Sequence, residues 1–119
     1  MFSKVRLEAA RSAEFPEGSA QHGYELQLPL DTFGRIDHEA WRAHRPACTF
    51  TRFWGDTVTA GRLQHGHRGW VLSTAPGTED DEVLFRGDAH QFVPGEYVTL
   101  IEPNGSHTVF KVARVQSPE

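Results

Sequence analysis

The feature that most constrains the fold of this chain is a succession of short β-type segments joined by tight turns. Residues 48–54 (CTFTRFW) and 57–63 (TVTAGRL) flank Gly55-Asp56, a pair typical of a type II′ hairpin turn. Residues 96–102 and 107–115 flank a loop containing Asn104-Gly105, a strong hairpin signal. The sequence therefore predicts two antiparallel hairpins, spanning residues 48–63 and 96–115.

The rest of the chain adds further strands and one short helix. Apolar residues alternate with polar ones, or run together between turn residues, in segments 5–10, 24–30, 70–75 and 83–86; segments 14–23 and 76–82 have the composition of loops. A helix is expected over residues 37–44, because Asp37 is a good N-cap and Pro46 ends the helical pattern. So short a helix needs tertiary packing, and Trp41 is its expected anchor.

These elements predict one mainly β domain covering residues 1–119. A chain of 119 residues can build one core. About seven strands at this spacing, with one short helix, are typical of a small antiparallel barrel of Greek-key or SH3-like topology, or of a sandwich. In the last hairpin, a two-residue Asn104-Gly105 turn would place Glu102 opposite His107, where they could form an ion pair, and Leu100 opposite Val109.

Charge and composition exclude several partners. The formal net charge is −4 and no basic cluster stands out, which disfavours nucleic-acid binding. No apolar run is long enough for the core of a signal peptide or for a membrane span. Cys48 is the only cysteine, which fits a reducing compartment. We therefore expect a soluble cytoplasmic protein with neither a nucleic acid nor a membrane as partner.

The segment QHGHRGW (64–70) raises the question of a metal site. Histidine is the commonest metal ligand, and a catalytic site for a divalent metal often has three protein ligands. His65 and His67 could supply two of them and His90 the third, with Asp88 or Glu96 nearby in the sequence. The preferred interpretation is a polar hairpin turn, because the two histidines flank Gly66 and follow the expected end of a strand at Leu63.

The segment FVPGEYVTL (Phe92–Leu100) resembles the F-x-P-G-Q-Y-V strand of the flavin-binding barrel in ferredoxin-reductase-like enzymes. The resemblance implies a six-stranded Greek-key barrel and a flavin or nucleotide cofactor. It covers a tenth to a fifth of the chain. The R-x-Y-S or R-x-Y-T motif that holds the flavin in those enzymes is absent from the following strand, HTVFKVARV, and no G-x-G-x-x-G fingerprint occurs.

Charged residues in the central part of the chain suggest a further site. Four arginines, Arg52, Arg62, Arg68 and Arg86, could gather at a barrel mouth and bind an anion. The alternative is that they are scattered and pair with the acidic loop TEDDE (78–82).

No motif for nucleophilic or phosphate chemistry is present. We therefore expect a non-catalytic binding or accessory module. Its partner would be another protein or a second copy of the same chain in a homodimer. The alternatives are a metal-dependent enzyme with His65, His67 and His90, and a flavin- or nucleotide-binding barrel around Phe92–Leu100.

Overall fold

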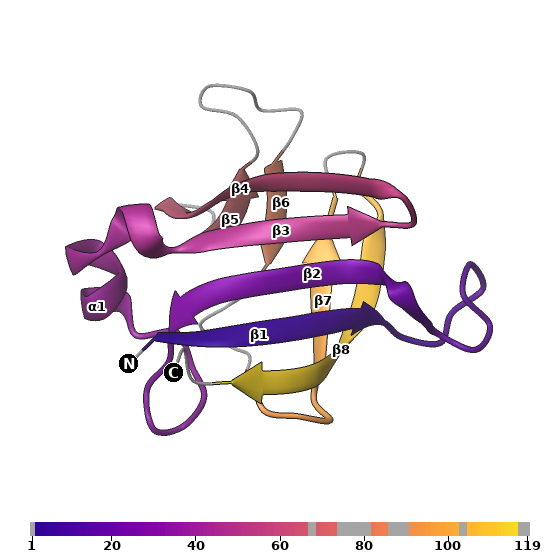
Figure 1. Ribbon diagram of the computed structural model, residues 1–119, viewed down its shortest axis with the longest axis horizontal. Coiled ribbons are helices and arrows are strands. Elements are labelled where there is room, and N and C mark those ends of the chain that lie inside the picture. Colours follow the sequence, from indigo (N-terminus) through magenta and orange to yellow (C-terminus); the bar gives the residue numbers. More distant parts are fainter. Residues whose placement is uncertain (1, 67–68, 74–81, 86–90, 103–104, 117–119) are drawn as a thin grey trace.

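The computed structural model describes residues 2–66, 69–73, 82–85, 91–102 and 105–116; at residues 66, 69 and 82–85 it describes the backbone alone. In these ranges the chain forms eight strands, one α-helix and one 3₁₀ turn (Figure 1). The elements are β1 (Phe2–Ala9), β2 (Ser19–Pro29), α1 (His38–Ala43), η1 (Arg45–Ala47), β3 (Thr49–Trp54), β4 (Thr57–Gly66), β5 (Gly69–Ser73), β6 (Glu82–Phe85), β7 (Tyr97–Ile101) and β8 (His107–Gln116).

The strands form one antiparallel sheet that closes on itself. Each strand pairs with the next in the chain, and β1 also pairs with β8. The predicted mainly β class with a small antiparallel barrel is thus confirmed. The strand order is that of an up-and-down barrel, because strands that are neighbours in the sheet are also neighbours in the chain. It differs from the Greek-key or SH3-like order expected from the sequence.

The period of two along the strands determines which side chains fill the interior. Val5 and Leu7 of β1, Leu26 and Leu28 of β2, and Val98, Leu100, Phe110 and Val112 of β7 and β8 are all buried. Successive residues of a strand point to opposite faces of the sheet, so the alternating residues of these strands face outward. The interior is therefore filled by apolar side chains over most of its length.

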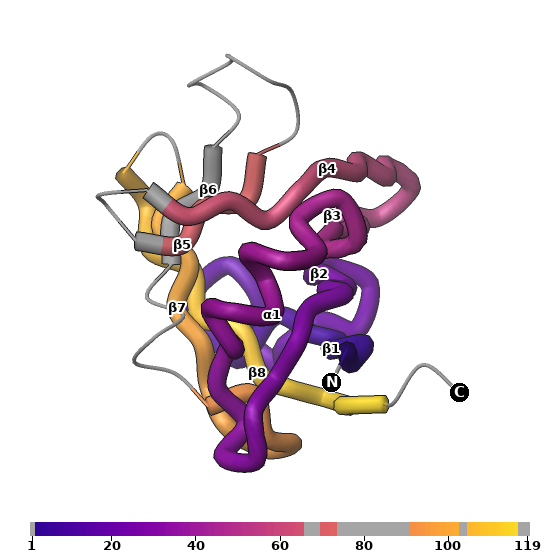
Figure 2. Tube along the Cα trace, turned by 90° about the vertical axis from the view of Figure 1, so that its left-hand side faces the viewer, coloured from indigo at the N-terminus to yellow at the C-terminus, as the bar shows by residue number. Residues whose placement is uncertain are grey.

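Helix α1 lies across one end of the barrel, as Figures 1 and 2 both show. The side chain of Asp37 accepts a hydrogen bond from the backbone N–H of Ala40 and caps the helix as predicted. Trp41 is buried against Trp70, with ring centroids 5.2 Å apart, and its Nε1–H donates to the carbonyl oxygen of Leu63 over 3.1 Å. The expected anchor of this short helix is confirmed.

The opposite end of the barrel is where the β1–β2, β3–β4 and β7–β8 connections turn, and we call it the hairpin end. The β3–β4 turn is the expected two-residue one, with Trp54 opposite Thr57 and a positive φ of 64° at Gly55. β2 begins at Ser19 inside the segment predicted to be a loop, because the β1–β2 pairing continues across a register shift between Glu8 and Ala9.

The register predicted for the β7–β8 hairpin is wrong by one residue. Ile101, rather than Glu102, lies opposite His107, and Leu100 lies opposite Thr108 rather than Val109. The connection is longer than two residues, since the Glu102 N–H donates to the Ser106 carbonyl and the Gly105 N–H to the Glu102 carbonyl. With this shift each residue of β7 has a different neighbour on β8, so Glu102 and His107 do not lie opposite each other as predicted.

Candidate binding site at the hairpin end of the barrel

An arginine faces the inside of the barrel near the hairpin end. In β3, Phe50 is buried, and alternation places Arg52 and Trp54 on the same inner face. Arg52 lies opposite Tyr24 of β2. Its Nε–H donates to the Tyr24 hydroxyl over 3.2 Å, and its guanidinium carbon lies 4.2 Å from the ring centroid of Trp54. The β2–β3 register and these two contacts hold the cation in place.

Further aromatic rings pack against Trp54 on the side of the β1–β2 loop. The ring of His22 lies 4.9 Å from that of Phe15 and 4.8 Å from that of Trp54. Phe15 and Trp54 also contact each other edge to face, at 5.7 Å. The Ser19 hydroxyl is hydrogen-bonded to Nδ1 of His22 over 2.7 Å, which fixes the orientation of the imidazole. Together these residues form a small aromatic cluster beside a charged group.

The hydroxyl of Tyr24 is buried and feels charges of both signs. The Tyr24 side chain is fully buried, and this burial raises the pKa of its phenol above the usual value. The nearby guanidinium of Arg52 opposes the shift, and the carboxylate of Glu102 adds to it. Tyr24 is therefore a neutral hydroxyl at physiological pH, able to donate one hydrogen bond while it accepts one from Arg52.

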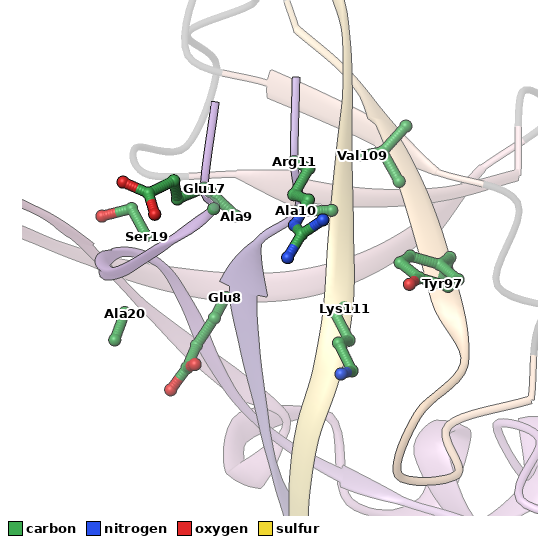
Figure 3. Close-up of a pocket in the computed structure, with 11 residues that line it drawn as sticks. Glu8, Ala9, Ala10, Arg11, Glu17, Ser19, Ala20, Tyr97, Val109 and Lys111 are labelled. Carbon is green, nitrogen blue, oxygen red and sulfur yellow. The ribbon is translucent and has the colours of Figure 1, made fainter. Parts of the chain in front are cut away.

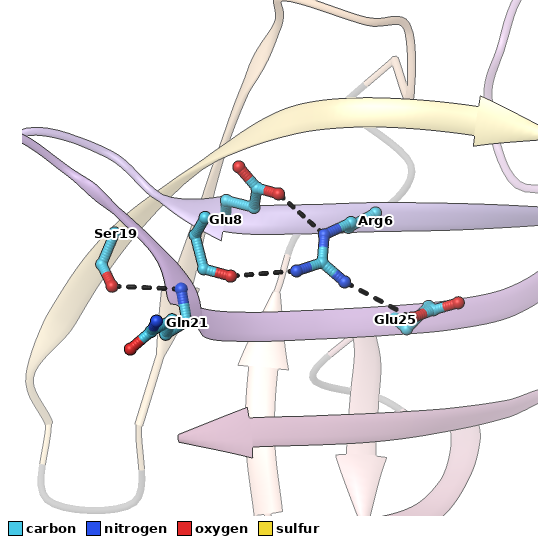
Figure 4. Close-up of polar contacts among 6 residues, drawn as sticks. Arg6, Glu8, Ser19, Gln21 and Glu25 are labelled. Atoms are coloured by element: carbon cyan, nitrogen blue, oxygen red, sulfur yellow. Dashed lines mark hydrogen bonds and ion pairs between the residues drawn. The ribbon is translucent and has the colours of Figure 1, made fainter. Parts of the chain in front are cut away.

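The outer face of the same wall carries a second arginine with quite different surroundings (Figure 4). Nε of Arg6 pairs with Glu8 at 2.7 Å, and Nη1 lies 3.7 Å from Glu25. Nη2 donates to the carbonyl oxygen of Ala20 over 2.9 Å. Among the residues that the structure describes, no carboxylate comes within 4.0 Å of Arg52. Arg6 is thus paired with carboxylates, whereas Arg52 has no carboxylate partner in the part of the chain that the structure describes.

The other predicted arginines do not join Arg52. Leu63 of β4 is buried and faces inward, so Arg62, its neighbour in the same strand, faces outward and is exposed. Arg68 and Arg86 lie outside the described residues, as do residues 78–81 of the acidic loop. The predicted anion site at a barrel mouth is represented in the described part of the chain by Arg52 alone.

The predicted metal ligands are placed only in part. His65 belongs to β4 and lies opposite Trp70, so the strand continues past Leu63, where the sequence suggested a loop. His67 and His90 lie outside the described residues. Within the described ranges no three His, Cys, Asp or Glu side chains gather closely enough to hold a metal ion.

The structure brings a different histidine to His65. The ring of His38, at the start of α1, lies 4.8 Å from the ring of His65. Arg42 lies one turn farther along the helix, and its Nη2 is 3.4 Å from Nδ1 of His38. The divalent-metal site of His65, His67 and His90 stays a prediction, because two of the three lie outside the described residues.

The Phe92–Leu100 segment begins beside Gly34 and runs through most of β7 toward the hairpin end of the barrel. Phe92 is buried, and its N–H donates to the carbonyl oxygen of Gly34 over 2.7 Å. Pro94-Gly95 makes a turn, closed by the Glu96 N–H on the Val93 carbonyl, and β7 starts directly after it. The Pro94-Gly95 turn thus comes directly before a strand, as the Pro-Gly pair suggests. The eight-stranded up-and-down order differs from the six-stranded Greek key that the resemblance implied, and flavin binding stays a prediction.

Two hollows lie elsewhere on the molecule. One, of about 600 Å³, lies on the outer wall of β1, β7 and β8, between residues such as Glu17, Tyr97 and Lys111 (Figure 3). Its lining carries charges of both signs, with Glu8 already paired to Arg6. The other, of about 700 Å³, lies beside Phe33 and Val93, which are exposed. Neither contains a charged group held inside the barrel.

Sequence reasoning singled out Arg52 but not its partners. Tyr24 is brought opposite Arg52 by the β2–β3 register, which no local spacing predicts. Trp54 lies two residues along the same strand, a spacing that puts both side chains on one face. In the described residues no helix is long and apolar enough to cross a membrane. No protein-family model, curated protein or solved structure matches this chain.

Proposed function

We propose that the protein is a non-catalytic binding module that holds a small anionic ligand at the hairpin end of its barrel. The observation that carries this proposal is Arg52, a half-buried cation on the inner face with no carboxylate partner among the described residues. A charge withdrawn from water is costly unless an opposite charge or several hydrogen bonds compensate it. An anionic ligand supplies both.

The chemistry of the site favours a carboxylate or a phosphate on a partly aromatic molecule. One N–H of Arg52 is used by Tyr24, and the forked end of a guanidinium suits the paired oxygens of such a group. Trp54 and Phe15 offer ring surfaces beside it. A barrel of eight strands has an interior that either is filled by side chains or holds one small ligand. At the hairpin end Phe15 and Trp54 are only partly buried, and we place the ligand there.

Calorimetric titration with 3-phenylpropanoate, benzoate and inorganic phosphate tests the proposal. We expect saturable binding of at least one probe. In Arg52→Gln the affinity should fall about 10- to 100-fold, the loss that follows from removing a hydrogen bond of about 1.5–3 kcal/mol to a charged group. Arg6→Gln is the matched control, because it removes the same charge from the outer face and should leave the affinity unchanged.

The fluorescence of Trp54 provides a second readout, since its ring contacts the guanidinium directly. The ligand should change the emission of the wild type and of Trp41→Phe, and not that of Trp54→Phe. Absence of saturable binding for all three probes, or equal affinities in wild type and Arg52→Gln, contradicts the proposal.

A further inference from the structure

Glu102 occupies the inner face of the barrel at the same end as Arg52. Val98 and Leu100 of β7 are buried and face the interior. Alternation along the strand places the next residue of this row, Glu102, on the inner side where β7 gives way to the hairpin. Its side chain is half-buried. The observed register leaves His107 opposite Ile101, so the partner that the sequence suggested for Glu102 is not across from it.

Arg52 and Glu102 approach the site from opposite walls. In the closed order of strands, β3 and β7 are separated by three strands in either direction. Burial raises the pKa of the Tyr24 phenol; the charge of Arg52 opposes this shift and that of Glu102 adds to it. Yet no ion pair joins them, since within the described ranges the ion pairs are those of Arg6. Two half-buried charges of opposite sign therefore lie at the same end of the barrel, and no ion pair in the described ranges joins them.

We propose that the ligand of the hairpin end is zwitterionic, with its carboxylate bound by Arg52 and an ammonium group bound by Glu102. This inference rests on the proposed function. A ligand that carries only an anionic group would satisfy Arg52 and be repelled by Glu102, whereas an amino acid or a related amino-carboxylate compensates both charges. The Tyr24 hydroxyl is left to donate to a ligand oxygen.

The aromatic cluster indicates the kind of side chain that such a ligand carries. Phe15, His22 and Trp54 contact one another, and Trp54 also lies 6.4 Å from Phe110, ring centroid to ring centroid. Aromatic pairs favour offset or edge-to-face contacts, so a flat apolar side chain fits here better than a polar one. The ligand class is therefore an amino acid with an aromatic or bulky apolar side chain.

Three probes with the same phenyl ring and similar chains separate the contributions of the two charges. Phenylalanine carries both groups, 3-phenylpropanoate only the carboxylate, and 2-phenylethylamine only the amine. By calorimetric titration at pH 7 we expect phenylalanine to bind about 10-fold more tightly than 3-phenylpropanoate, and 2-phenylethylamine to bind most weakly. Glu102→Gln should weaken phenylalanine about 10-fold and leave 3-phenylpropanoate unchanged or tighter.

Glu96→Gln is the matched control, because this exposed carboxylate lies directly before the same strand and its loss should change neither affinity. Circular dichroism checks that each variant is folded. If 3-phenylpropanoate binds as tightly as phenylalanine and still depends on Arg52, the zwitterion is refuted while the anion-binding proposal stands. If none of the probes binds, both proposals fail.

Discussion

Replacing Gly61 with alanine should damage the barrel far more than a single methyl group suggests. Gly61 of β4 lies opposite Phe50. A Cβ built on Gly61 would lie 2.1 Å from the carbonyl oxygen of Ser73 and 2.7 Å from Cε1 of Phe50. Ordinary contact begins at 3.4 Å, so the oxygen must retreat by 3.4 − 2.1 = 1.3 Å. The oxygen belongs to the backbone of β5, and the Phe50 ring is buried in the core.

The magnitude follows from what must move. Forcing a group into a packed core costs about 1–3 kcal/mol, and pushing the Phe50 ring off its rotamer adds about 0.5–1.5 kcal/mol. Opening the end of the β4–β5 ladder sacrifices a hydrogen bond worth about 1 kcal/mol. We therefore expect Gly61→Ala to lower the free energy of unfolding by about 2.5–5.5 kcal/mol, a large part of the ~5–15 kcal/mol typical of a domain.

Urea denaturation followed by tryptophan fluorescence and by circular dichroism measures this loss, which should appear as a lower midpoint at constant slope. Gly95→Ala is the control for backbone strain alone: φ is 95° at Gly95, but nothing lies within 4 Å of an added Cβ. That variant should lose about 1–2 kcal/mol. A loss below about 1 kcal/mol in Gly61→Ala would show that β4 and β5 are not packed as described.

Two further predictions concern the α1 end of the barrel. Trp41→Ala should lower the free energy of unfolding by about 3–5 kcal/mol, and Trp41→Phe by clearly less, because only the bond to Leu63 and part of the volume are lost; equal urea midpoints for the two variants would contradict this anchor. Burial raises the pKa of the Cys48 thiol from 9.0 to about 11. The unfolded chain loses this proton first, so stability is unaffected below pH 9 and falls between pH 9 and 11, by up to about 2.7 kcal/mol. The decline from pH 8.5 to 11 should be shallower in Cys48→Ala, and an identical pH profile would refute the role of the thiol.

Local chemistry explains which parts of the fold could be predicted from the sequence. The Gly55-Asp56 turn, the Asp37 cap and the Trp41 anchor each depend on residues a few positions apart, and each is found as predicted. The β7–β8 register failed because the number of residues in the turn, and not the Asn-Gly signal alone, decides which residues face each other.

The candidate site could be anticipated only through its residue types. The sequence identified Arg52 as one of four arginines, but only the barrel shows that Arg52 faces inward while Arg62 faces outward. Likewise it identified His65, whereas the neighbour that the structure gives it is His38, far away in the chain.

By itself, then, the sequence determined a mainly β barrel, its two hairpins, the tight turn of the first of them and a capped helix, because alternation and turn chemistry act within a few residues. Only the tertiary structure decided the up-and-down closure, the register of β7 against β8, and the placement of Arg52 on the inner face opposite Tyr24. The physical reason is that strand pairing and closure are long-range. Which strands pair, and which charged side chains face the interior, depends on contacts between segments that lie far apart in the sequence.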